Sequence, residues 1–397
     1  MLYNDFQDLK LSALGFGAMR LPLLADGTID QAELDRMVDA AMAAGVNYFD
    51  TAHPYHGGKS EVCLGRSLSR YPRESWFLAD KYPGHQNVRG VKPLDPTEVF
   101  EEQLQRCGVE YFDFYLLHNV NENSMYYYGN PDNHYLDYFL EQKEKGRIRH
   151  LGFSSHAAPP CLEQFLSLHG EHMEFCQIQL NYVDWTLQEA EKKCEILKNA
   201  GIPVWVMEPV RGGRLAAFDA ETEAKLRAMR PEESIPAWAF RWLRTVPRPT
   251  MILSGMSNLA QMQDNLKTFE EDRPLTAQEL ALLGEVADGI SRMIPCTGCR
   301  YCCAGCPRKL DIPLLLSMAN DMAITRSFNT LMRYSALGEG KHADDCIACG
   351  QCTRICPQGI DVPGELKKLT EVMAGQKSWE EICRERAAAA EAAKAKA

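Results

Sequence analysis

The first 270 residues alternate short apolar runs with amphipathic stretches. The runs resemble strands that are buried on both faces, and the stretches between them have a helical period. The eight apolar runs span 11–17, 46–50, 76–80, 112–118, 148–154, 175–180, 202–207 and 250–255. Helices are predicted near 30–44, 59–70, 96–107, 132–145, 159–169, 187–200, 233–244 and 258–267. Eight strands that alternate with helices predict an α/β fold, a closed (β/α)8 TIM barrel.

An open Rossmann-type sheet is the main alternative to this barrel. Such a sheet carries a Gly-rich fingerprint directly after its first strand. The segment GFGAMR at 15–20 has two glycines and then no third at the required spacing. The barrel is therefore favoured, and we assign it residues 1–290.

The composition changes sharply at Pro295-Cys296, after an acidic helical stretch at 276–292. We predict a second, mainly helical domain over 291–375. The remaining residues, 376–397, end in a stretch of Ala, Lys and Glu. Low complexity of this kind is typical of a tail that is a frayed helix or partly disordered.

Cysteines are concentrated in the second domain. The chain has 15 cysteines, and nine of them lie between Cys296 and Cys356. Two segments, 296–307 and 346–357, each contain C-x2-C-x2-C-x3-C-P. This spacing lets three thiolates bind one iron–sulfur cubane while the fourth reaches a different iron. Structural zinc, the alternative, needs four ligands per ion and has no use for the third evenly spaced cysteine.

Residues 290–365 resemble a bacterial-type two-cluster [4Fe–4S] ferredoxin. The resemblance implies that each cluster takes three cysteines from one segment and the fourth from the other. One cluster would be held by Cys296, Cys299, Cys302 and Cys356, and the other by Cys346, Cys349, Cys352 and Cys306. Cys303 also forms a C-x2-C pair with Cys306, so the choice between Cys302 and Cys303 stays open.

The charge balance limits the partners of this chain. It has 43 Lys and Arg against 54 Asp and Glu, a net charge of −11. An acidic chain without a segregated basic patch is repelled by nucleic acid. No apolar run reaches the roughly 20 residues of a membrane helix, and the first residues lack the order of a signal peptide. We expect a cytoplasmic protein that binds neither nucleic acid nor membrane.

The candidate catalytic residues lie at the ends of the predicted strands, where barrel enzymes have their active sites. Asp50, Lys81 and His118 stand at the ends of the second, third and fourth apolar runs, and Tyr55 follows Asp50 in the next loop. We expect the Lys81 ammonium to lower the pKa of Tyr55, and Asp50 to hold Lys81 in place. His118 could donate a hydrogen bond to a substrate carbonyl.

Residues 10–270 resemble the aldo/keto reductase family. The resemblance rests on GVNYFDTAHPY at 45–55, ADKYP at 79–83 and DFYLLHN at 113–119. It implies a catalytic tetrad of Asp50, Tyr55, Lys81 and His118 with Tyr55 as the proton donor. It also implies hydride transfer from NADP or NAD at the barrel mouth, and a small aldehyde or ketone as substrate.

The same resemblance implies cofactor-binding positions. Arg211 lies in VRGGRL (210–215), which resembles the loop over the pyrophosphate, and Met207 stands where many members have an aromatic ring. Arg211 or Arg214 could bind a 2′-phosphate, because Gly255 and Gln261 occupy the positions that commonly carry basic residues. The candidates at the nicotinamide are Ser154, Ser155, Gln177 and Met207, and those at the adenosine half are Gly255, Ser257, Asn258, Gln261 and Asn265. The choice between NADPH and NADH stays open.

A chain with both units can be interpreted in three ways, because nicotinamide passes hydride whereas iron–sulfur clusters pass single electrons. The barrel can reduce a carbonyl while the clusters are structural or exchange electrons with an electron-transfer protein or flavoprotein. The clusters can instead feed a flavin or a substrate in the barrel, as in a ferredoxin-type reductase. The chain can also be a nicotinamide-binding redox sensor without useful turnover. The complete tetrad favours the first interpretation.

Overall fold

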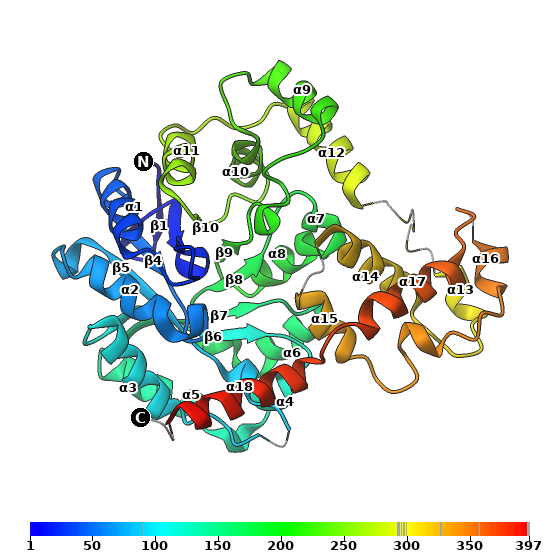
Figure 1. The fold of residues 1–397 in the computed structure, drawn as a ribbon, viewed down its shortest axis with the longest axis horizontal. Helices are drawn as coiled ribbons and strands as arrows, with labels where there is room; N and C mark the ends of the chain where they lie inside the picture. Colours follow the sequence, from blue (N-terminus) through cyan, green and yellow to red (C-terminus); the bar gives the residue numbers. More distant parts are fainter. Residues whose placement is uncertain are drawn as a thin grey trace. The chain divides into compact units, whose positions relative to one another are not determined.

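The computed structural model describes residues 1–397 except 90, 292, 293, 295, 297, 299, 326, 327, 357 and 395–397. The chain forms two compact units (Figure 1). The first contains Met1–Asn87 and Lys92–Leu282, and the second contains Val88–Val91 and Leu283–Ala397.

The first unit is a closed barrel of parallel strands in the order β10-β3-β4-β5-β6-β7-β8-β9. Each strand overlaps one of the apolar runs, so the predicted (β/α)8 TIM barrel is confirmed. The strands are β3 (Leu14–Gly17), β4 (Tyr48–Asp50), β5 (Phe77–Tyr82), β6 (Phe112–Val120), β7 (Ile148–Ser155), β8 (Cys176–Gln179), β9 (Val204–Met207) and β10 (Met251–Gly255). The barrel closes where β10 pairs with β3.

Helices surround these strands (Figure 1). The eight helices that the sequence pattern predicts are α1 (Gln31–Ala43), α2 (Lys59–Leu68), α3 (Pro96–Cys107), α5 (Tyr135–Glu144), α6 (Pro159–His169), α8 (Ala190–Asn199), α10 (Ile235–Thr245) and α11 (Leu259–Thr268). Interactions between neighbouring residues determine where these helices begin, as α3 illustrates. The Asp95 side chain accepts hydrogen bonds from Thr97 and Glu98 at the start of α3, where Pro96 needs no donor partner.

The barrel unit also contains elements that the apolar runs do not reveal. An antiparallel hairpin of β1 (Tyr3–Phe6) and β2 (Leu9–Ser12) precedes the barrel, and Phe6 joins its core with its ring 4.9 Å from that of Trp205. Further helices are α4 (Met125–Tyr128), α7 (Asp184–Leu187) and α9 (Ala220–Met229), and α12 (Ala277–Ser291) begins in this unit and ends in the second. Short strands such as β1 leave too few positions for a recognisable alternation.

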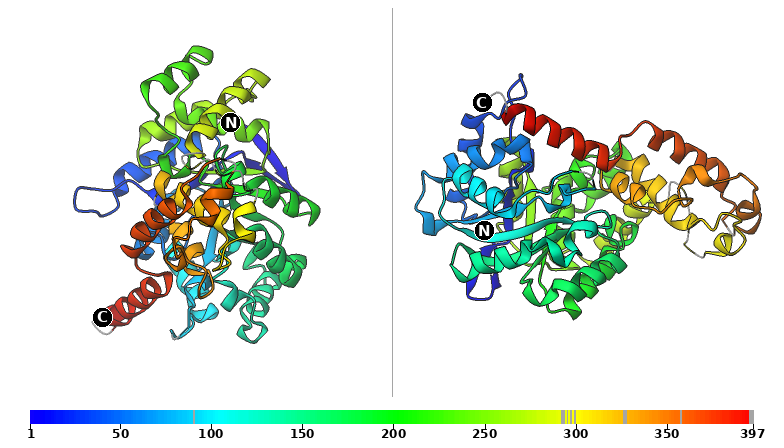
Figure 2. Two further views of the ribbon diagram at one scale, coloured as in Figure 1. Left: turned by 90° about the vertical axis from the view of Figure 1, so that its right-hand side faces the viewer. Right: turned by 90° about the horizontal axis from the view of Figure 1, so that it is seen from below.

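The second unit is mainly helical. Its helices are α13 (Tyr301–Ala304), α14 (Ile312–Thr325), α15 (Phe328–Ser335), α16 (Gln351–Ile355), α17 (Val362–Ala374) and α18 (Trp379–Lys394). Leu315 and Leu316 of α14 and Leu366 and Leu369 of α17 belong to its core, and several cysteines pack against it. Helix α18 covers most of the expected tail and projects from the other helices of this unit (Figure 2). Its first turn is anchored, because Trp379 is 2% exposed.

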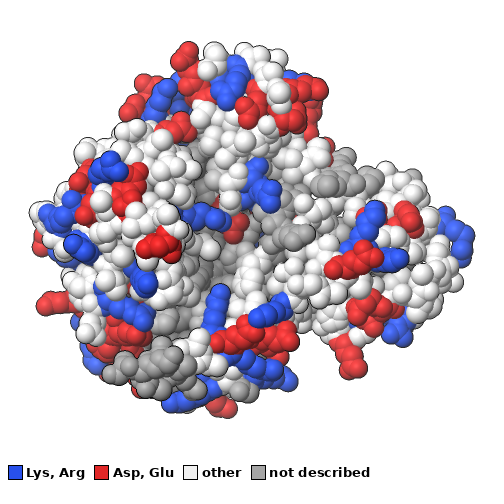
Figure 3. Space-filling view, viewed as in Figure 1, with Lys and Arg blue, Asp and Glu red and all other residues white. Residues whose placement is uncertain are grey.

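No described helix has both the length and the apolar character that a membrane span needs. On the face drawn in Figure 3, Lys and Arg side chains are interspersed with Asp and Glu.

Candidate functional site

Neighbouring strands bring the predicted catalytic residues to one rim of the barrel. Asp50 ends β4, while Lys81 and His118 lie near the ends of β5 and β6. Parallel pairing aligns Asp50 with Ala79 and Lys81 with Leu116, so the ends of the three strands lie side by side. Tyr55 begins the short turn η2 (Tyr55–Gly58), which follows β4.

Lys81 and Asp50 form a buried ion pair. The Lys81 Nζ donates to Asp50 Oδ1 at 2.5 Å and to the Thr51 carbonyl at 2.6 Å, and Gln177 donates to Asp50 Oδ2 at 3.2 Å. Lys81 is 0% exposed and Asp50 is 4% exposed. Burial lowers the pKa of Lys81, but the charges of Asp50 and Tyr55 raise it by more. Lys81 is therefore an ammonium with satisfied partners, which is how a buried charge is tolerated.

Tyr55 lies beside this ion pair. Lys81 Nζ is 5.1 Å from the centroid of the Tyr55 ring, and the His118 ring lies edge-on with its centroid 5.8 Å away. Burial raises the pKa of Tyr55, the Lys81 charge opposes that effect, and the Asp50 charge adds to it. Because the net pKa is raised, the expectation of a lowered value is wrong for the free protein: the loss of solvation outweighs the ammonium. Tyr55 therefore keeps its proton.

His118 is neutral and has a free buried nitrogen. Burial lowers the pKa of His118 well below its usual range, and the neighbouring charges of His85 and Lys81 lower it further. Its Nδ1 is buried without a hydrogen-bond partner in the part of the chain that the structure describes. A buried polar atom without a partner costs free energy unless a ligand satisfies it. His118 is therefore a candidate contact for a substrate oxygen.

The residues expected at the nicotinamide lie on β7, β8 and β9. Ser154 Oγ accepts the Asn119 N–H at 2.8 Å, and Ser155 Oγ donates to the Val120 carbonyl at 3.1 Å. Gln177 is 2% exposed and donates to Asp50, as described above. Met207 ends β9 and is half-buried. These side chains therefore line the same end of the barrel as the catalytic candidates.

The residues expected at the adenosine half surround the start of α11. Asn258 caps this helix by accepting the Gln261 N–H at 2.9 Å, and the Ser257 N–H donates to Gln261 Oε1 at 2.8 Å. Asn265 is 5% exposed and donates to Ser254 Oγ at 2.9 Å. Gly255, at the end of β10, is exposed. Asn265 thus holds the end of β10 in place, whereas the other residues of this group are exposed to solvent.

Of the two arginines expected to bind a 2′-phosphate, only one is exposed at this rim. Arg211 is only 1% exposed, and its Nε donates to Asp184 Oδ1 at 3.0 Å, so its charge is already paired inside the protein. Arg214 is exposed.

Arg20, which follows β3, is a residue that our sequence interpretation missed. It is exposed and borders two loops: its terminal nitrogen is 3.1 Å from a Cβ built on Gly212, and its Cγ is 3.4 Å from one built on Gly255. The signal was available in GFGAMR, as a basic residue just after the first strand of the barrel.

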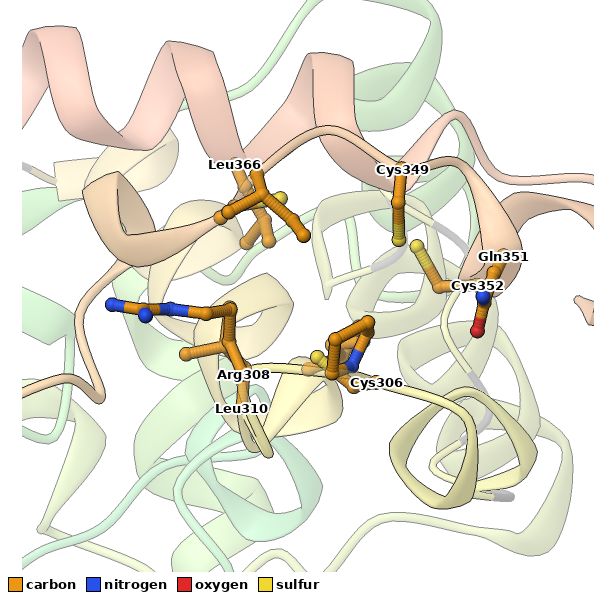
Figure 4. A pocket seen from close by; sticks show the side chains of 11 residues that line it. Cys306, Arg308, Leu310, Cys349, Gln351, Cys352 and Leu366 are labelled. Atoms are coloured by element: carbon orange, nitrogen blue, oxygen red, sulfur yellow. The ribbon is translucent and has the colours of Figure 1, made fainter.

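One predicted cluster-binding set lines a single pocket in the second unit. Figure 4 shows the sulfur atoms of Cys349 and Cys352 turned toward a common space that Cys306 borders from the other side. Cys346 completes this set of four in the pocket lining. Convergent thiols around an apolar pocket fit an iron–sulfur cluster.

The second predicted set is described only in part. Cys296, Cys302 and Cys356 are half-buried against the core of the second unit. Cys299 lies outside the described residues. Cys303 packs against the same core as Cys302, so the choice between these two ligands stays open.

A buried Lys–Asp pair, a tyrosine and a histidine thus meet at the mouth of a (β/α)8 barrel. The aldo/keto reductase family model matches residues 13–288, and this chain belongs to that family. Members use NAD(P)H. A 4Fe-4S dicluster domain model matches residues 295–361, which indicates iron–sulfur clusters.

Individual relatives match the barrel. An NADH-specific methylglyoxal reductase of Escherichia coli (strain K12) is 24% identical over 72% of this chain and 97% of its own length. A probable aldo-keto reductase 1 of Glycine max is 24% identical over 56% of this chain, and the alignment covers only 64% of that protein. Among solved structures, the holo form of aldo-keto reductase AKR11C1 from Bacillus halodurans is 24% identical with a TM-score of 0.57, covering 72% of this chain and 96% of its own. These structural matches show the fold.

Proposed function

We propose that this enzyme reduces a small aldehyde or ketone with NADPH or NADH, and that Tyr55 is the proton donor. The observation that carries the proposal is the 2.5 Å Lys81–Asp50 ion pair beside Tyr55, with Lys81 Nζ 5.1 Å from the Tyr55 ring centroid. A protonated phenol next to a fixed ammonium can release its proton and leave a stabilised phenolate.

Each rim residue has a separate role in this proposal. A nicotinamide nucleotide, when bound, supplies the hydride. Tyr55 donates its hydroxyl proton to the carbonyl oxygen, and the Lys81 ammonium stabilises the phenolate that remains. Asp50 holds Lys81, and neutral His118 offers a hydrogen bond to the same oxygen. Ser154, Ser155, Gln177 and Met207 would hold the nicotinamide end, and the exposed Arg20 and Arg214 would contact the phosphates.

The relatives suggest where to begin with substrates. One of them is named an NADH-specific methylglyoxal reductase, and its similarity covers 72% of this chain. We therefore propose methylglyoxal as the first carbonyl to test and NADH as the first nucleotide, with NADPH assayed in parallel.

We further propose that the second unit carries two [4Fe–4S] clusters, which are structural or exchange electrons with a separate electron-transfer protein or flavoprotein. The support is the pocket lined by Cys306, Cys346, Cys349 and Cys352 together with the repeated cysteine spacing. Thiolate ligands of this kind persist in a reducing compartment such as the cytoplasm. Anaerobically purified protein should contain about eight irons per chain, and colourless protein loaded with zinc would overturn the proposal.

The decisive experiment on the barrel compares Tyr55→Phe with Tyr3→Phe. We expect Tyr55→Phe to lower kcat by at least about 100-fold while nucleotide binding is unchanged, because only the proton donor is removed. Tyr3 is a matched control, because its hydroxyl donates to the Gly45 carbonyl ahead of β4, at the other end of the strands. Carbonyl-dependent NADH oxidation and fluorescence titration give the two readouts. Full activity in Tyr55→Phe would refute the assigned role.

A further inference from the structure

Two carboxyl groups are buried next to the catalytic lysine. Asp80 of β5 and Glu61 of α2 are both 0% exposed, and their side chains face each other. Asp80 Oδ1 accepts the backbone N–H of Lys81 at 2.8 Å. Glu61 Oε2 accepts from Arg106 at 3.0 Å, whereas Glu61 Oε1 is buried without a hydrogen-bond donor among the described residues.

Close packing fixes this arrangement. A Cβ built on Gly65 of α2 would lie 2.2 Å from the Cys107 carbonyl of α3, so glycine at this position lets the two helices touch. The Cys107 thiol in turn donates to Asp80 Oδ2 at 3.7 Å. The close contact of α2 with α3 therefore places the Cys107 thiol of α3 against Asp80, one helical turn from Glu61 on the facing helix.

The cations nearby do not balance both carboxyl groups. Lys81 is bonded to Asp50, and Arg106 divides its guanidinium between Glu61 and Glu102, the latter at 2.5 Å. Two carboxylates in one buried site cannot both remain ionised, because each destabilises the charge of the other. Burial and the Glu61 charge raise the pKa of Asp80 well above its usual range. The titratable or charged groups that face this pair are Lys81, Tyr55, Arg106, Cys107 and Tyr115.

We propose that Asp80 holds a proton at neutral pH and shares it with Glu61 in a hydrogen bond, so that Asp50 is the single charged carboxylate at Lys81 and Asp80 is neutral. A protonated carboxyl group can donate a hydrogen bond to a carboxylate, which explains how two acceptors face each other without repulsion. A charged Asp80 would oppose loss of the proton from Tyr55. The shared proton thus leaves the Lys81 charge available to Tyr55.

The catalytic part of this inference rests on the proposed reductase function and is tested by two matched substitutions. Asp80→Asn replaces a neutral acid with a neutral amide, so kcat should stay within about threefold of wild type with an unshifted pH profile. Asp50→Asn removes a charge, so kcat should fall by about 100-fold. If Asp80→Asn is impaired as severely as Asp50→Asn, or shifts the pH profile, Asp80 is charged and the inference is wrong.

A second measurement does not depend on catalysis. Because the pKa of Asp80 is raised in the native state, the folded chain binds more protons than the unfolded chain at pH values between the ordinary and raised pKa. Unfolding should therefore become easier as the pH rises through this range. The unfolding equilibrium constant of wild type, relative to Asp80→Asn, should grow by about tenfold per pH unit.

Glu61→Gln should weaken the same pH dependence, because only burial then raises the pKa of Asp80, while Glu102→Gln, at an exposed partner of Arg106, should retain it in full. Glu61→Gln also keeps the test decisive if Asp80→Asn does not fold. A pH-independent difference between wild type and these variants would overturn the shared proton. If the pH dependence is found but no carbonyl is reduced, the shared proton stands and the proposed function fails.

Discussion

The two units of this chain prepare their chemistry in opposite ways. At the barrel rim, buried charges already have protein partners: Lys81 bonds Asp50 and Thr51, and Gln177 supports Asp50 from β8. In the second unit, the predicted cluster ligands lie on or beside α13 and α16, helices of 4 and 5 residues. Helices this short are not stable by themselves. We therefore expect that the barrel builds its site by folding, whereas the region around α13 and α16 needs bound clusters to become ordered.

Removing iron should have the largest effect, and only on the second unit. Metal binding can contribute about 10 kcal/mol or more to the folding of a small metal-dependent domain. We expect chelation, or Cys352→Ser, to abolish amide protection from hydrogen exchange around α13 and α16 while the barrel strands stay protected. Cys63→Ser, at a half-buried cysteine of α2, is the control and should leave both units unchanged. Retained protection around α13 and α16 in iron-free protein would contradict metal-dependent folding.

Removing the buried Lys81 ammonium should lower both the stability and the activity of the barrel. Lys81→Met leaves Asp50 as an unpaired buried carboxylate, which costs about 3 to 5 kcal/mol of stability. The same substitution removes the charge that stabilises the Tyr55 phenolate, so reduction should fall by about 1000-fold at neutral pH. Urea unfolding and steady-state kinetics measure the two effects.

Lys143→Met is a suitable control, because that ammonium pairs with Glu174 at a partly exposed position. Its kcat should be close to that of wild type. A Lys81→Met variant with an unchanged pH profile would count against the role of Lys81 at Tyr55.

A smaller effect is expected from an ion pair remote from the barrel rim. Arg230 donates to Glu279 Oε1 at 2.6 Å and lowers the pKa of Glu279 to about 2. The stabilisation is therefore present above the ordinary pKa of 4.5 and is lost as the pH falls through about 2. Glu279→Gln should destabilise the protein by about 2 kcal/mol at pH 7, and the difference should shrink as the pH approaches about 3.

Thermal unfolding of wild type and Glu279→Gln across this pH range measures that difference. Glu221→Gln is the control, because it removes the carboxylate that pairs with Lys225 at an exposed position of α9. It should have no measurable effect on the unfolding temperature. A destabilisation that is the same at every pH would show that the ion pair does not account for the loss.

Local patterns in the sequence predicted most of the barrel. Asp95-Pro96 marks the start of α3, and the apolar run 112–118 lies within β6. These features follow from neighbouring residues, so no tertiary information is needed. The β1–β2 hairpin was missed because Phe6 is held by distant partners such as Trp205. Arg20 was missed because its proximity to Gly212 and Gly255 depends on barrel closure.

By itself, the sequence determined the alternation of strands and helices, the order of the candidate catalytic residues and the repeated cysteine spacing. Each of these depends on residue type and short-range spacing. Tertiary structure alone decided the ionisation states: Tyr55 keeps its proton despite Lys81, and Asp80 faces Glu61 although 18 residues separate them along the chain. The physical reason is that solvation and through-space charge depend on burial, which no short stretch of sequence specifies.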